Sequence, residues 1–331
     1  MEPLLRLIAD SQLAKTALDL SGYKPMARPH RVKIREVGPR DGFQNEPDLI
    51  PTDDKVRLIN ALGAAGFSHM EVASFVRPDV IPQLADGVEV LRRIEVPNTT
   101  RLSVLLPNER GLHNALRVRE HFHEVGLVVS ASETHNLKNI NCSIEESMDA
   151  SSRIIPRAVA EGLQCEAIIA TAFGCPYEGE VKIDTVLSLA ERLVEMGAGE
   201  IGFGDTTGMA NPSQVEEFFG RAVERLPGPE LTAHFHNTRG QGLANALVAL
   251  NMGCASFESS FGELGGCPVP PGSTGNIATE DLLSMFTEMG VETGVDLPTV
   301  IDSARLAQEL LGRKLGSHTL VAGPVDWRPS L

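Results

Sequence analysis

Two histidines spaced two residues apart give the first chemical signal in this sequence. His234 and His236 end a short strand-like run, and residues i and i+2 of a strand point to the same face. Two imidazoles aimed together are what a metal site requires. A pair of buried, hydrogen-bonded histidines is the alternative. The same tripeptide at residues 121–123 precedes a strand instead of ending one, so we expect it to have a structural or surface role.

Acidic side chains stand at comparable positions in three other strand-like runs. Asp41 can supply a hard oxygen ligand and Arg40 beside it a fixed cation, although Pro-Arg-Asp-Gly is also favourable turn chemistry. Glu71 lies within a second strand-like run, and Asp205 ends another. Because an isolated buried carboxylate is costly, each must be paired or functional. A structural ion pair is the alternative for both.

Residues 262–276 are dense in glycine and proline, which predicts a loop that can hinge over a site. Cys267 lies in this loop, where a thiol is a poor core residue. We assign Cys142, Cys165 and Cys254 to ordinary packing.

Strand-like and helix-like segments alternate eight times between about residues 31 and 290. The strands are expected over 32–37, 70–75, 102–106, 125–129, 167–171, 201–203, 231–236 and 256–260. The helices are expected over 55–65, a stretch whose end is 88–94, a polar stretch ending at 120, 143–160, 186–196, 215–223, 243–250 and 281–289. Such alternation predicts an α/β fold with a parallel sheet, and eight units match a closed (β/α)₈ TIM barrel. A doubly wound open sheet is the alternative, but no Gly-x-Gly-x-x-Gly follows the first strand.

The barrel should occupy residues 31–301, preceded by an N-terminal arm with a helix over 1–30. A C-terminal helix, expected over 304–311, and a tail would complete residues 302–331. Barrel enzymes build their active sites at the C-terminal ends of the strands, which is where His234, His236 and Asp205 fall.

The composition excludes several classes of function. The chain has 331 residues with 29 Lys plus Arg and 44 Asp plus Glu, a net charge of −15. This acidic balance argues against binding to nucleic acid or to an anionic membrane. We find no apolar run of about 18 residues and no signal or transit peptide. Five cysteines in so long a chain do not indicate a disulfide framework. We therefore expect a soluble, cytoplasmic enzyme.

Taken together, these motifs resemble the 3-hydroxy-3-methylglutaryl-CoA (HMG-CoA) lyase family, among the barrel metallolyases that include isopropylmalate and homocitrate synthases. The resemblance runs from about residue 32 to 296. It rests on EVGPRDGFQNE at 36–46, NINCSIEES at 139–147, GCPYEG at 174–179, GDTTG at 204–208, and LGGCP followed by GN and ATEDL. It implies metal ligands at Asp41, His234, His236 and Asn276. It also implies catalytic roles for Arg40, Cys267, Glu71 and Asp205.

The reaction implied by the resemblance is a retro-Claisen cleavage of HMG-CoA, or of a related branched 3-hydroxyacyl-CoA. Its products would be acetyl-CoA and acetoacetate or the matching ketoacid, as in leucine catabolism. Mg²⁺ or Mn²⁺ would bind the substrate hydroxyl. Arg40 would stabilise the enolate oxygen, Cys267 would transfer a proton, and Glu71 and Asp205 would position these groups. The family also implies an acyl-CoA partner and a homodimer. Candidate substrate contacts are Gln44, Ser74, Arg77, Lys138, Asn139 and Arg239.

Several residues depart from the family pattern around these positions. Glu263 stands where the family loop has Gly, Asn237 where Asp follows the histidines, and Arg239 where Tyr is usual. Arg77 replaces a common Ser, and Gly202 lies in a changed Ser-Leu-Gly segment. Either these changes are neutral, or they fit a longer or more acidic acyl group, with Arg77 and Arg239 binding a carboxylate or the CoA phosphates. A synthase that condenses acetyl-CoA with a 2-oxoacid, a binding protein on an inactive barrel and a metal hydrolase are the rival functions.

Overall fold

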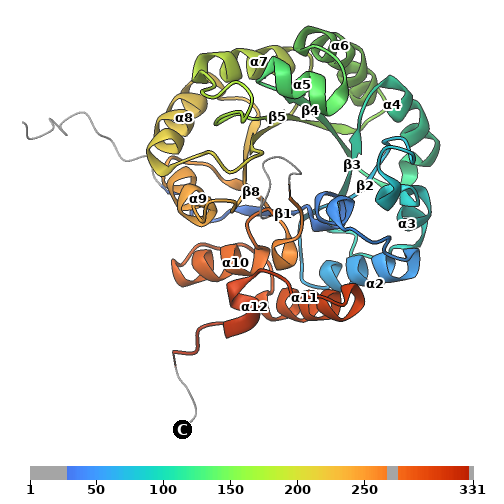
Figure 1. Cartoon of the computed structure of the whole chain (residues 1–331), viewed down its shortest axis with the longest axis vertical. Coiled ribbons are helices and arrows are strands. Elements are labelled where there is room, and N and C mark those ends of the chain that lie inside the picture. Colours follow the sequence, from blue (N-terminus) through green and yellow to red (C-terminus); the bar gives the residue numbers. More distant parts are fainter. Residues whose placement is uncertain (1–27, 267–274, 328–331) are drawn as a thin grey trace, which may run out of the picture.

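The computed structural model describes residues 28–266 and 275–327, and it contains a closed barrel of eight parallel strands (Figure 1). Each strand pairs with its neighbours in sequence, and β8 pairs with β1 to close the barrel. The strands are β1 (Lys33–Glu36), β2 (His69–Ser74), β3 (Arg101–Leu106), β4 (Glu124–Ser130), β5 (Gln164–Ala170), β6 (Glu200–Asp205), β7 (Glu230–Phe235) and β8 (Ser256–Ser259). The predicted TIM barrel is confirmed.

Most of the helices form a ring outside the strands, while α5 lies inside this ring (Figure 1). They are α2 (Thr52–Gly63), α3 (Gly87–Arg93), α4 (Glu109–Ala115), α5 (Glu133–Ile140), α6 (Ile144–Ala160), α7 (Ile183–Glu195), α8 (Pro212–Arg225), α9 (Gly242–Asn251), α10 (Thr279–Glu288), α11 (Leu297–Leu311) and α12 (His318–Ala322). Helix α6 begins with a capping box, in which Ser143 accepts from the Glu146 N–H and Glu146 accepts from the Ser143 N–H. None of the described helices has the length and apolarity needed to cross a bilayer.

The sequence did not predict helix α5, which follows β4 at the mouth of the barrel. Its residues are mostly polar and lack apolar spacing, while Ser132 caps it by accepting from the His135 N–H. Helix α11 begins at Leu297, earlier than the helix expected over 304–311. The expected N-terminal helix lies in residues 1–27, outside the described residues. The domain boundaries stay predictions.

Apolar side chains fill the layer between strands and helices, whereas the lower barrel interior is charged. Phe203 of β6 packs with Phe218 of α8, and Phe235 of β7 packs with Phe173, which also contacts Phe218. Inside the barrel, Arg35 of β1 is 1% exposed. It forms ion pairs with carboxylates from four other strands, at 2.8 Å to Glu124, 2.6 Å to Glu166, 2.5 Å to Glu200 and 3.7 Å to Glu258. A buried cation needs such partners.

Candidate metal centre

Three of the predicted metal ligands meet at the C-terminal mouth of the barrel. His234 is the penultimate residue of β7, His236 follows β7, and Asp41 lies in the helical turn Gly38–Gly42 after β1. One potential ligand atom from each lies within 4.8 Å of the others. The Nε2 atoms of the two histidines are 3.0 Å apart. Two imidazole nitrogens this close need either one shared proton or a cation between them.

Asn276 completes the donor set. A β-bridge joins it to His236, and its Nδ2 donates to Asp41 Oδ2 at 2.8 Å. Its carbonyl oxygen Oδ1 is buried and has no hydrogen-bond partner among the described residues. Because an unpaired buried carbonyl is unfavourable, this oxygen is suited to a cation. Two imidazoles, a carboxylate and an amide oxygen form a set that accepts Mn²⁺ or Mg²⁺.

Close packing of the Gly38–Gly42 turn fixes where Asp41 lies. A Cβ atom at Gly38 would come within 2.5 Å of the Phe261 ring, so glycine is required there. Glu36 Oε1 accepts from the Gly38 N–H at 2.8 Å and from the Phe261 N–H at 3.1 Å. Burial raises the pKa of Glu36 to about 7, although these bonds oppose the rise. Glu36 was not among the functional residues predicted from the sequence, although a carboxylate at the end of a buried strand is a signal of such a role.

Arg40 is held against the metal centre by two carboxylates. Its Nε and Nη2 atoms bond Glu71 Oε2 at 2.6 and 2.5 Å, and its Nη1 bonds Asp41 Oδ1 at 2.7 Å. Arg40 is 8% exposed, and it contributes to the cavity wall. Burial raises the pKa of Glu71 to about 7, while the charge of Arg40 opposes this shift. Glu71 therefore fixes the orientation of the Arg40 guanidinium, which faces the cavity.

A carboxylate that was not predicted from the sequence orients one of the predicted metal ligands. Glu258 of β8 lies 2.8 Å from His234 Nδ1 through its Oε2 atom. This contact places the donor N–H on Nδ1 and leaves Nε2 for a metal ion. Glu258 Oε1 also lies 3.7 Å from Arg35 Nε, so Glu258 connects the ion pairs inside the barrel to His234. In the sequence, the signal for a functional role of Glu258 is a charged residue inside the predicted eighth strand.

Asp205 lies beside the centre and shapes the loop after β6. Its Oδ1 accepts from the N–H groups of Met209 at 2.7 Å and Ala210 at 3.0 Å. Its Oδ2 is buried and unpaired within the described part of the chain. Burial raises the pKa of Asp205 to about 7, against the effect of these hydrogen bonds.

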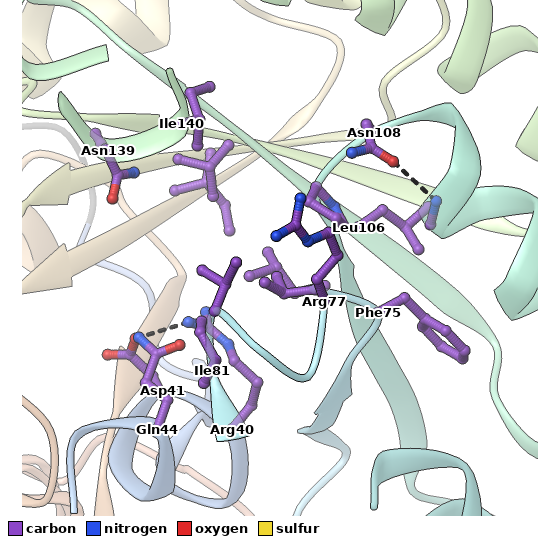
Figure 2. A pocket seen from close by; sticks show the side chains of 18 of the residues that line it. Arg40, Asp41, Gln44, Phe75, Arg77, Ile81, Leu106, Asn108, Asn139 and Ile140 are labelled. Carbon is purple, nitrogen blue, oxygen red and sulfur yellow. Dashed lines mark hydrogen bonds and ion pairs between the residues drawn. The ribbon is translucent and has the colours of Figure 1, made fainter. Parts of the chain in front are cut away.

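The metal centre opens into a cavity of about 1000 Å³. Figure 2 shows Asp41 and Gln44 on one side of it and Asn139 and Ile140 across from them. Apolar side chains form much of the wall, among them Phe75, Ile81, Leu105, Leu106, Val128 and Ile168. Such a cavity can enclose an elongated molecule whose polar end reaches the metal centre.

Three of the predicted substrate contacts line this cavity. Gln44 Nε2 donates to Asp41 Oδ1 at 3.0 Å, and Asn139 is exposed at the end of α5. Arg77 follows β2 and forms an exposed ion pair with Asp79. Its guanidinium therefore stands at the cavity mouth beside a competing carboxylate.

The other three predicted contacts are not among the residues that line the cavity. Ser74 is buried, and its Oγ accepts from the Val76 N–H at 3.2 Å. Lys138 lies in helix α5 and not in the expected loop, with its Nζ 5.1 Å from the centre of the Tyr177 ring. Arg239 Nη1 donates to the carbonyls of Thr207 at 2.8 Å and Gly208 at 2.7 Å. Arg239 thus joins two loops of the chain.

The remaining predicted residues fall away from the cavity or outside the described part. Cys267 lies in residues 267–274, which the structure does not describe. His123 precedes β4 and accepts from the Leu102 N–H at 3.1 Å, as the expected structural role requires. Cys165 and Cys254 are buried, and burial raises the pKa of each thiol to about 12. Cys142 is half-buried.

The fold and the site define a barrel protein with a divalent-metal donor set at its C-terminal face. A family model described as HMGL-like matches residues 31–307, and the chain belongs to this family. The hydroxymethylglutaryl-CoA lyase of Bacillus subtilis is 44% identical over 295 residues, which cover 89% of this chain and 98% of that protein. The mitochondrial hydroxymethylglutaryl-CoA lyase of Rattus norvegicus is 42% identical over 294 residues, with 89% of this chain and 90% of that protein covered.

Solved structures show the same relationship. The crystal structure of the Bacillus subtilis HMG-CoA lyase matches with a TM-score of 0.87 and 44% identity, covering 90% of this chain and 99% of that one. An HMG-CoA lyase from Acinetobacter baumannii, in complex with coenzyme A and 3-methylmalate, matches with a TM-score of 0.87 and 40% identity. That match covers 92% of this chain and 100% of the other. The family predicted from the sequence motifs is therefore confirmed.

Proposed function

We propose that this chain is a divalent-metal-dependent carbon–carbon lyase that cleaves HMG-CoA to acetyl-CoA and acetoacetate. The observation that carries the proposal is the convergence of Asp41, His234, His236 and Asn276 beside the buried Arg40. The similarity to proteins named HMG-CoA lyase supports this reaction.

Each residue of the site has a role that its geometry allows. Asp41, His234, His236 and Asn276 would hold Mg²⁺ or Mn²⁺, which when bound lowers the pKa of a substrate hydroxyl. Arg40 presents a fixed cation to the thioester oxygen, where negative charge develops as the carbon–carbon bond breaks. Glu71 keeps that guanidinium in place through two short bonds. Asp205 supports the loop after β6, and Cys267 is proposed to transfer the proton to the new acetyl carbon.

The cavity supports an acyl-CoA as the substrate. Its apolar walls suit the pantetheine arm, which is long and largely uncharged, and the metal centre lies on the cavity wall. The relative from Acinetobacter baumannii was solved with coenzyme A, which is consistent with this assignment. Gln44 and Asn139 are proposed contacts because both line the cavity, whereas Ser74, Lys138 and Arg239 would act indirectly.

A more acidic acyl group is the second candidate, and Arg77 at the cavity mouth favours it. The geometry does not favour a longer acyl group through Gly202. Gly202 is not among the residues that line the cavity, and a side chain there would meet Glu166 and Ile168, so its absence does not widen the cavity directly. A cytoplasmic location, a homodimer and a role in leucine catabolism are further parts of the proposal.

The test is mass spectrometry of the products formed from HMG-CoA by the full chain with Mg²⁺ or Mn²⁺. We expect acetyl-CoA and acetoacetate, with formation abolished by EDTA and restored by excess metal. Asp41→Ala, which removes a proposed ligand, should be inactive, while Asp302→Ala at an exposed position of helix α11 serves as a matched control. Cleavage that persists in EDTA, or in Asp41→Ala, would refute the metal-dependent reaction. Cleavage confined to an analogue whose acyl group carries a second free carboxylate would favour the second candidate.

A further inference from the structure

Two residues that depart from the family pattern touch each other in the structure. Asn237 follows the metal ligand His236, and Glu263 lies after β8, near the start of the glycine-rich loop. Asn237 Nδ2 donates to Glu263 Oε1 at 2.7 Å. An amide and a carboxylate suit each other here, whereas an aspartate in place of Asn237 would put two carboxylates in contact. The two departures therefore depend on each other.

The backbone of Asn237 contacts the other side of the same loop. Its N–H donates to the carbonyl of Gly275 at 3.1 Å, and Gly275 precedes the metal ligand Asn276. Asn237 thus forms hydrogen bonds with two segments of the glycine-rich loop, through its side chain with Glu263 and through its backbone with Gly275. The two sides are packed closely, because a Cβ atom at Gly275 would overlap the carbonyl oxygens of Glu263 and Gly265.

Glu263 occupies a backbone conformation that needs support. Its φ is +61°, in the left-handed region that residues other than glycine rarely adopt. Its Oε2 atom lies against Gly316, where any Cβ atom would overlap it. The Gly316 N–H also donates to the carbonyl of Gly262 at 3.0 Å. The Glu263 carboxylate is therefore confined between Asn237 and the C-terminal segment, and it has little room to turn away.

We propose that Asn237 and Glu263 form a clamp that sets the position of Asn276 in the metal centre. Asn276 Nδ2 donates to the carbonyl of Leu264 at 3.2 Å, next to Glu263, as well as to Asp41. If Glu263 and Leu264 moved, the Oδ1 atom of Asn276, which has no hydrogen-bond partner among the described residues, would therefore shift relative to His234 and His236. Asn237 and Glu263 are positioning residues, and this role rests on the proposed metal centre but not on which acyl-CoA is cleaved.

The test is a swap of the two polar groups, with Mn²⁺ affinity of the metal-free protein measured by electron paramagnetic resonance. Asn237→Asp should weaken Mn²⁺ binding by about tenfold to a hundredfold, the range for residues that support metal ligands. Adding Glu263→Gln to that variant lets the new glutamine amide donate to the introduced aspartate, so affinity should return to within about threefold of the original protein. Glu263→Ala, which removes the acceptor, should be as weak as Asn237→Asp. Glu216→Gln, at an exposed position of α8, removes a carboxylate charge as Glu263→Gln does and should leave Mn²⁺ affinity unchanged.

The possible results distinguish failure of the clamp from failure of the proposed metal centre. If the unsubstituted protein binds no Mn²⁺, the metal centre is refuted, and the clamp with it. If it binds Mn²⁺ and Asn237→Asp binds equally well, the clamp alone is refuted. The clamp is also refuted if the double variant stays as weak as Asn237→Asp. Thermal unfolding of all variants shows whether they fold, and the rescue by the double variant distinguishes positioning from general damage. At saturating Mn²⁺, the kcat of Asn237→Asp should approach the kcat of the original protein.

Discussion

Removal of the Glu71 carboxylate should separate a catalytic role for its ion pair from a purely structural one. Glu71 accepts from two nitrogen atoms of Arg40, at 2.6 and 2.5 Å, and both side chains are buried. In Glu71→Ala these two donors lose their partner, while the bond from Arg40 to Asp41 at 2.7 Å remains. The guanidinium would then be free to turn away from the cavity toward Asp41.

The expected magnitudes follow from this geometry. Breaking a buried ion pair by removing one partner costs about 3–5 kcal/mol of stability, and the remaining bond to Asp41 favours the lower end. Losing a positioned donor to a developing oxyanion costs about 10²–10³-fold in kcat. We therefore expect Glu71→Ala to unfold more easily and to lose at least about 10²-fold in kcat. Glu71→Gln, which keeps one acceptor oxygen, should fall between Glu71→Ala and the original protein.

The assay is steady-state kinetics with HMG-CoA at saturating Mn²⁺, alongside urea unfolding and Mn²⁺ titration of each variant. Saturating metal is needed because Arg40 also contacts Asp41, a proposed ligand. A Glu71→Ala protein that is less stable but keeps kcat within about threefold would show that the pair is only structural. That result would refute the role assigned to Arg40 and Glu71.

Three further predictions test other parts of the site. Glu258→Gln should weaken Mn²⁺ binding by about 10–100-fold in a titration, because it loses the charged partner of His234 Nδ1; unchanged affinity would contradict this role. The Glu36 carboxyl, with a pKa raised by burial to about 7, is neutral in the fold at low pH. Its ionisation therefore destabilises the protein as pH rises from about 4.5 through 7, so the free energy of unfolding relative to Glu36→Gln should fall over that interval in urea titrations and stay constant below it. A constant difference throughout would refute the shift. Mn²⁺ at about 100 times its Kd should stabilise the fold by about 2.7 kcal/mol, seen as a rise in Tm that His234→Ala lacks; an equal rise in His234→Ala would place the metal elsewhere.

The barrel was predictable because its signals are local and repeated. Each of the eight strands appears as a short apolar run, and the structure places all eight within a few residues of the expected ranges. The chain order of a (β/α)₈ barrel then places strand ends together, so His234, His236 and Asp41 were expected at one face of the barrel, whereas the role of Asp41 as a ligand followed from the family motifs. Asn276 entered only through the family motif, since nothing in its local sequence marks a ligand.

The residues that were missed or misplaced depend on contacts between distant segments. Glu258 became significant only when β8 was placed beside β7, next to His234. Lys138 was assigned to a loop because α5 lacks apolar spacing and depends on its Ser132 cap and on packing. Arg239 was assigned to substrate, yet its donors reach the carbonyls of the β6–α8 loop, a pairing that no linear pattern reveals. The contact between Asn237 and Glu263 is likewise visible only in three dimensions.

The most direct test of the metal centre is a crystal of the full chain grown with Mn²⁺, with diffraction measured at the manganese absorption edge. We expect an anomalous peak bonded to the Nε2 atoms of His234 and His236, which already lie 3.0 Å apart. Asp41 and the Oδ1 atom of Asn276 should complete the protein ligands, and the histidines should move apart to admit the ion. A manganese peak that lies elsewhere, or a set of ligands that omits the histidines, would contradict the account.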